Sequence, residues 1–147
     1  MAPRNVEANE QLKDERRNQI LLAALKSFTK NGFSATKMSD IANDAGISYG
    51  LVYHYFKSKD KIYTELIQHA IDSLGNVVEE IQATVDEPIE QIRRIVSHVF
   101  DSVNSREAPG YYYVLVMNAV TCEAAPVSSS NIIRESVNRL TMLKDII

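Results

Sequence analysis

Two short amphipathic segments that meet at a single glycine constrain the fold of this chain more than any other feature. The first segment, residues 37–45, carries its apolar side chains on one face, and Thr36 precedes it as a helix N-cap. Gly46 can take the left-handed conformation that ends a helix. Ser48 then caps a second segment, which runs to about residue 55. The pattern predicts two helices joined by a tight turn.

The rest of the chain also has a helical period. Apolar residues recur at steps of three and four, which predicts further helices over about 13–31, 58–74, 88–103, 111–124 and from 131 to the end. We expect residues 1–12 to form a loose arm, and breaks at Ala108-Pro109-Gly110 and at the serines 128–130. The helix over 111–124 is apolar nearly all round, which predicts burial on several sides.

No sustained two-residue alternation occurs, so no strand is expected. The predicted fold is all-α, with a three-helix head over residues 13–57 and a helical body over residues 58–147. The head carries most of the positive charge: residues 1–62 hold ten basic and seven acidic side chains, and residues 63–147 hold six and twelve. This split favours a head that approaches phosphate, although chance variation on two solvated surfaces is an alternative.

The composition excludes several classes of protein. No apolar run approaches the roughly 18 residues of a membrane span, and the N-terminus is too polar for a secretory signal, so we expect a cytoplasmic protein. Cys122 is the single cysteine, and His69 and His98 have no partner ligand at metal spacing, so no metal or cofactor is expected. A nucleophile elbow and a phosphate-binding glycine loop are also missing, which argues against an enzyme.

The second short helix has an unusual exposed face. Opposite its inner side chains Val52 and Phe56 it carries hydroxyl and ring groups together with a glycine, at Ser48, Tyr49, Gly50, Tyr53 and His54. Such groups can bind phosphate oxygens or base edges, although the tyrosines could instead be ordinary packing residues. The lysines 57, 59 and 61 follow at the start of the next helix, where they attract phosphate or are simply solvated.

The whole stretch resembles the signature of the tetracycline-repressor (TetR) family, from about residue 20 to residue 66. The resemblance implies a helix-turn-helix regulator that binds a palindromic operator in double-stranded DNA as a homodimer and responds to a small molecule. It further implies DNA contacts from Thr36, Lys37, Ser48, Tyr49, Gly50, Tyr53, His54 and Lys59. Leu51 replaces the small hydroxyl residue usual in the family, so its contact is apolar, to a thymine methyl group, or absent.

The effector is expected between the helices of the body. We expect its ligand-binding residues to be Phe100, Val103, Tyr112, Tyr113, Met117 and Cys122. Family members usually have two more long helices, whereas this chain stops inside an apolar periodic segment, so either the body is incomplete or dimerisation differs. A helical module that binds DNA or a partner without any ligand remains the alternative function.

Overall fold

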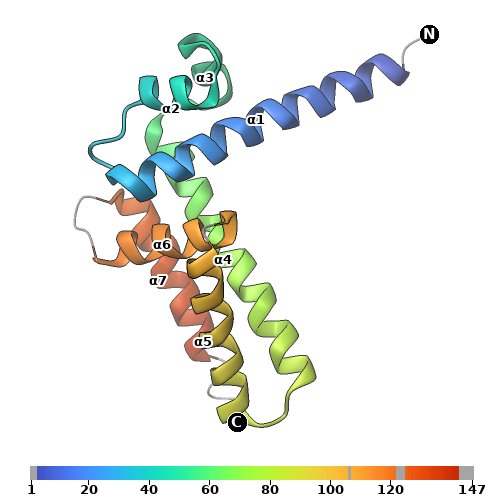
Figure 1. Ribbon diagram of the computed structural model, residues 1–147, viewed down its shortest axis with the longest axis vertical. Coiled ribbons are helices and arrows are strands. Elements are labelled where there is room, and N and C mark those ends of the chain that lie inside the picture. Colours follow the sequence, from blue (N-terminus) through green and yellow to red (C-terminus); the bar gives the residue numbers. More distant parts are fainter. Residues whose placement is uncertain (1–2, 106, 122–124, 143–147) are drawn as a thin grey trace.

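The computed structural model describes residues 3–105, 107–121 and 125–142, which form helices and loops without a strand (Figure 1). The helices are α1 (Pro3–Asn31), α2 (Met38–Ala45), α3 (Tyr49–Tyr55), α4 (Lys59–Thr84), α5 (Pro88–Ser105), α6 (Ala108–Thr121) and α7 (Val127–Met142). The all-α prediction is therefore confirmed. None of these helices is long and apolar enough to cross a membrane.

Gly46, Ser48 and Ser58 cap helices of the head as the sequence predicts, whereas Thr36 does not. Gly46 takes the left-handed conformation with φ 67° and ends α2, as the sequence predicts. The Ser48 hydroxyl accepts a hydrogen bond from the Leu51 amide at 3.3 Å and starts α3. Ser58 caps α4 in the same way through the amide of Lys61. These caps fix where α3 lies between α2 and α4.

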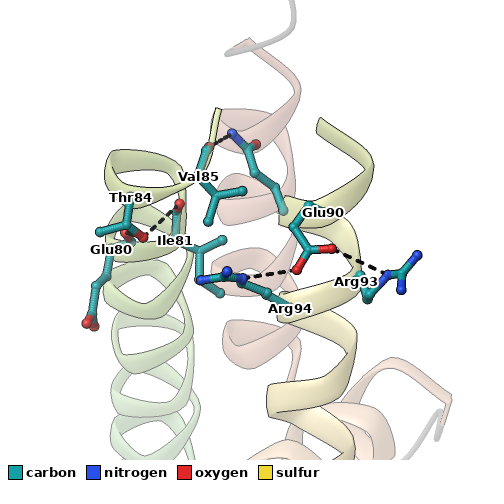
Figure 2. A network of polar contacts seen from close by, with 8 residues as sticks. Glu80, Ile81, Thr84, Val85, Glu90, Arg93 and Arg94 are labelled. Carbon is teal, nitrogen blue, oxygen red and sulfur yellow. Dashed lines mark hydrogen bonds and ion pairs between the residues drawn. The ribbon is translucent and has the colours of Figure 1, made fainter. Parts of the chain in front are cut away.

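The body is built on a hairpin of α4 and α5 (Figure 1). The 26-residue α4 leaves the head, and the chain returns along it as α5. Figure 2 shows polar contacts at this turn, where the Thr84 hydroxyl donates to the Ile81 carbonyl at 3.3 Å. The Val85 amide donates to the same carbonyl at 2.9 Å. On α5, the Glu90 carboxylate pairs with Arg93 at 3.5 Å and Arg94 at 3.2 Å. Helix α6 then packs against α1 and α5, and α7 packs against α4.

A single hydrophobic core runs through the head and into the body. Ile20 and Phe28 of α1 and Ile62 of α4 are fully buried, and the same cluster includes Leu115 and Ala119 of α6. The core therefore crosses the boundary that the sequence suggested after residue 57.

Three helix starts differ from expectation. Helix α1 begins at Pro3, so most of the expected loose arm is helical; residues 5–16 are exposed, which explains why they lack an apolar period. The expected break at residues 108–110 forms the first turn of α6, and the serines 128–130 lie in the first turn of α7. Proline and serine are tolerated in a first turn because its amides have no partner inside the helix.

Candidate nucleic-acid interface

A concave surface of the head lies over the expected DNA-binding segment. It is an open hollow of about 660 Å³ between the starts of α2 and α4 and the exposed side of α3. Its lining is polar and basic: Ser34, Thr36, Lys37, Met38, Ser39, Tyr49, Tyr53, Lys57, Ser58, Lys59 and Asp60. Five of the predicted DNA-binding residues are brought together here.

Tyr49 and Tyr53 form a pair on the exposed side of α3. Their rings meet edge to face with centroids 4.9 Å apart, and their hydroxyl oxygens share a hydrogen bond of 3.2 Å. The exposed fractions of the two residues are 54% and 39%, so neither is a packing residue of the core. The hydrogen bond with Tyr49 raises the pKa of Tyr53, which keeps that hydroxyl protonated. One O–H group of the pair stays available to donate to an anion.

The lysines differ in how they are held. The Lys59 ammonium donates to the Phe33 carbonyl at 2.7 Å and lies 4.2 Å from the centre of the Phe33 ring. It has two further N–H donors, so a phosphate contact by Lys59 stays a prediction. Lys37 and Lys57 are exposed on the lining of the hollow, and Lys61 is exposed one turn into α4.

Thr36 has a different role from the predicted one. Its side chain is fully buried, and its hydroxyl lies 2.8 Å from the Gly32 carbonyl oxygen and 3.2 Å from that of Ser27. It therefore ties the loop before α2 to the end of α1, and its hydroxyl cannot reach a DNA backbone. It is not the N-cap of α2 either, since Lys37 occupies that position and its amide donates to the Asp40 carboxylate at 2.9 Å.

The other predicted residues of the recognition helix lie at its surface. Ser48, Gly50 and His54 are exposed, and Leu51 is half-buried. A Cβ atom on Gly50 would meet no atom within 4 Å, so nothing inside the chain requires a glycine there. The space in front of Gly50 is open to an approaching backbone, and the DNA contacts of these four residues stay predictions.

Two hydroxyl groups in the hollow were missed by the sequence reasoning. Ser34 and Ser39 are both exposed and line the hollow. Ser39 lies in the first turn of α2, where unpaired amides and hydroxyls together favour an anion. Its position just after the start of the helix was the signal that could have identified it.

The predicted ligand-binding residues of the body differ in how far they are exposed, and their binding of a ligand stays a prediction. Phe100, Met117 and Val103 have exposed fractions of 68%, 64% and 41%. Tyr112 and Tyr113 are half-buried, and burial raises the pKa of both hydroxyls. Cys122 lies outside the described residues. Helix α6 packs against α1, α4, α5 and α7, which agrees with the expected burial on several sides, and it leaves Met117 and Val120 exposed.

Helix α5 presents an apolar stripe to solvent. None of its residues is buried, and the stripe comprises Ile89, Ile92, Val96, Phe100 and Val103. In the part of the chain that the structure describes, no three His, Asp or Glu side chains are placed to hold a metal ion.

Comparison with known proteins agrees with this geometry. The model of the bacterial regulatory proteins of the tetR family matches residues 20–66, which include the hollow and the whole of α3. The chain belongs to the TetR family. This is a family of transcription regulators and not of enzymes, which confirms the non-enzymatic prediction.

The relatives of this TetR-family chain include a transcriptional activator and a transcriptional repressor. It is 32% identical over 117 residues to the transcriptional activator FasR of Mycolicibacterium smegmatis, covering 80% of this chain and 53% of FasR. It is 33% identical over 98 residues to the transcriptional repressor KstR2 of the same organism, covering 67% and 48%. The chain thus spans about half the length of these curated relatives.

A solved structure supports the fold over most of the chain. The ketosteroid transcriptional regulator KstR2 of Mycobacterium tuberculosis superposes with a TM-score of 0.70 at 27% identity, covering 89% of this chain and 65% of that one.

Proposed function

We propose that this chain is the DNA-binding and effector-sensing part of a cytoplasmic transcription regulator that binds a palindromic operator as a homodimer. The observation that carries the proposal is the basic hollow beside α3, where the Tyr49–Tyr53 pair and the exposed Lys37 and Lys57 surround one concave surface. Ammonium groups neutralise phosphates there, and the tyrosine pair supplies a protonated donor.

Effector binding is assigned to the body. We propose a repressor that leaves its operator when a small apolar or amphipathic molecule binds beside Tyr112 and Tyr113, since α6 packs directly against α1. Solved structures of the same fold hold choline, in a regulator of Saccharomonospora viridis, and triclosan, in SmeT. The exposure of Phe100 and Met117 favours a second candidate, a DNA-binding module without an effector.

The DNA-binding proposal can be tested with Lys57→Ala and a matched control. A duplex selected by the protein from a random-sequence library serves as the probe, and fluorescence anisotropy gives the affinity at several salt concentrations. Loss of one phosphate contact should lower the slope of log affinity against log salt by about one unit. Lys26→Ala is the control, because Lys26 is an exposed lysine on a separate hollow between α1 and α2.

An unchanged slope in Lys57→Ala, or an equal change in both variants, would contradict an interface at this hollow. Titration of the protein–DNA complex with triclosan and with choline then separates the two candidates. Release of the duplex by either compound supports effector sensing, and an unchanged complex supports the module without an effector.

A further inference from the structure

An ion pair joins α1 to α4 directly behind the recognition helix. The guanidinium of Arg17 makes two parallel contacts with the two carboxylate oxygens of Glu65. Such a forked pair fixes the direction of both side chains, unlike a single exposed contact. The carbon at the centre of the same guanidinium lies 4.9 Å from the centre of the Phe56 ring. Arg17 therefore contacts the residue that directly follows α3.

Phe56 connects this pair to the recognition helix itself. It is the C-cap of α3, its amide donates to the Val52 carbonyl at 2.9 Å, and its side chain is buried. A shift of Arg17 can therefore reach the last turn of α3 through a buried ring.

Helix α4, which carries Glu65, packs against α6. His69 lies one turn after Glu65 on α4 and stacks on the Tyr112 ring of α6 with centroids 4.7 Å apart and an interplanar angle of 26°. Burial, and then the charge of Glu65, raise the pKa of the Tyr112 hydroxyl. Tyr112 is thus stacked on a residue of α4 that lies one turn from the residue that pairs with Arg17.

We propose that Arg17 and Glu65 are positioning residues that transmit the position of α6, through Tyr112, to the end of the recognition helix. This inference rests on the proposed function, because an effector bound beside Tyr112 would change DNA binding through the Arg17–Glu65 junction. Arg17 and Glu65 lie outside the proposed DNA interface. The proposal requires that a change at Tyr112 alters the stability of α3, although the two need not be in contact.

Hydrogen exchange of the full chain without DNA tests the junction directly. Amides at positions 52–56 report on the last turn of α3. Glu65→Gln should speed their exchange about three- to tenfold, since it removes a forked, charge-assisted pair. The matched control is Glu90→Gln, which breaks the exposed Glu90–Arg94 pair on α5 (Figure 2) and should leave α3 unchanged.

The coupling is measured by a double-mutant cycle. Tyr112→Leu should change the exchange of the α3 amides in the otherwise unaltered chain, and by less than half as much when Glu65→Gln is also present. His69→Ala provides a second variant that leaves no cavity in the core, because His69 is exposed. Its effect on the exchange of the α3 amides should likewise be less than half as large when Glu65→Gln is also present.

Two results would overturn the proposal. One is that Tyr112→Leu and His69→Ala each change the exchange of the α3 amides equally with and without Glu65→Gln. The other is that Glu65→Gln has no effect on the exchange of these amides. A chain that binds no duplex would instead overturn the proposed function, and the exchange results would stand independently of it.

Discussion

Thr36 shows what a local sequence pattern can and cannot predict about a single residue. A threonine before a short helix indicates an N-cap, but the pattern does not tell whether the side chain turns outward or toward α1. In the structure it turns inward and meets the carbonyl groups of Ser27 and Gly32. The exposed tyrosines were predicted correctly because Val52 and Phe56 define the buried side of α3.

We therefore predict that Thr36→Val lowers stability and leaves the interface chemistry intact. The substitution keeps the shape but removes the donor, so the free energy of unfolding should fall by about 1–3 kcal/mol. Urea denaturation measures this change. Ser34→Ala, in the same loop but exposed, is the control and should alter stability by less than about 0.5 kcal/mol. Unchanged stability with weaker DNA binding would restore the DNA contact first expected of Thr36.

At the scale of elements, the sequence predicted both ends of α2, α3 and α5 and the start of α4 to within about two residues, because each has a capping residue or a glycine or proline at its boundary. The end of α4 was placed at about residue 74, whereas the helix continues to Thr84. The starts of α6 and α7 were missed because residues that break a helix interior are acceptable in its first turn, so Pro109 and the serines 128–130 did not mark loops. The start of α1 was missed because residues 5–16 are exposed and have no apolar period.

Gly110 adds a constraint that no propensity could reveal. A Cβ atom built on it would lie 2.2 Å from the Ser102 carbonyl oxygen, so α6 can approach α5 only with glycine at this position. We predict that Gly110→Ala destabilises the chain by about 1–3 kcal/mol, because backbone atoms must move apart.

Gly75→Ala is the matched control for that substitution. Gly75 lies within α4, and a Cβ atom there would meet nothing within 4 Å. This variant should gain about 0.5–1 kcal/mol from helix propensity. Thermal denaturation of both variants gives the comparison, and a Gly110→Ala protein as stable as the unaltered chain would show that the two helices are not closely packed.

For the molecule as a whole, the sequence indicated a head and a body but not how they meet. The sequence of α6 is apolar nearly all round, so it did not reveal that Leu115 and Ala119 join the buried core while Met117 and Val120 face solvent. The basic hollow was predictable from the capping and turn signals of one segment, whereas the predicted ligand-binding residues lie on α5 and α6, two consecutive helices for which the sequence did not specify how they pack. Their arrangement depends on helix packing, which no local pattern specifies.

The shared core predicts a single unfolding transition. Leu115→Ala should cost about 2–5 kcal/mol, since Leu115 is fully buried. The loss should appear in the head as well: amide exchange in α1 should accelerate by the same factor as exchange in α6. Urea unfolding monitored by circular dichroism and by exchange of both helices tests this. Two separate transitions, or an α1 that keeps its protection, would contradict it.

The contact of α6 with α1 also limits how such regulators can be recombined. A hybrid that joined this DNA-binding head to the sensor domain of another protein would replace Leu115 and Ala119. These two residues belong to the same buried core as α1, so side chains of another size would not fill that core. The interchangeable part is therefore larger than the helix-turn-helix: α6 must travel with the head, and a functional splice needs its junction after Thr121.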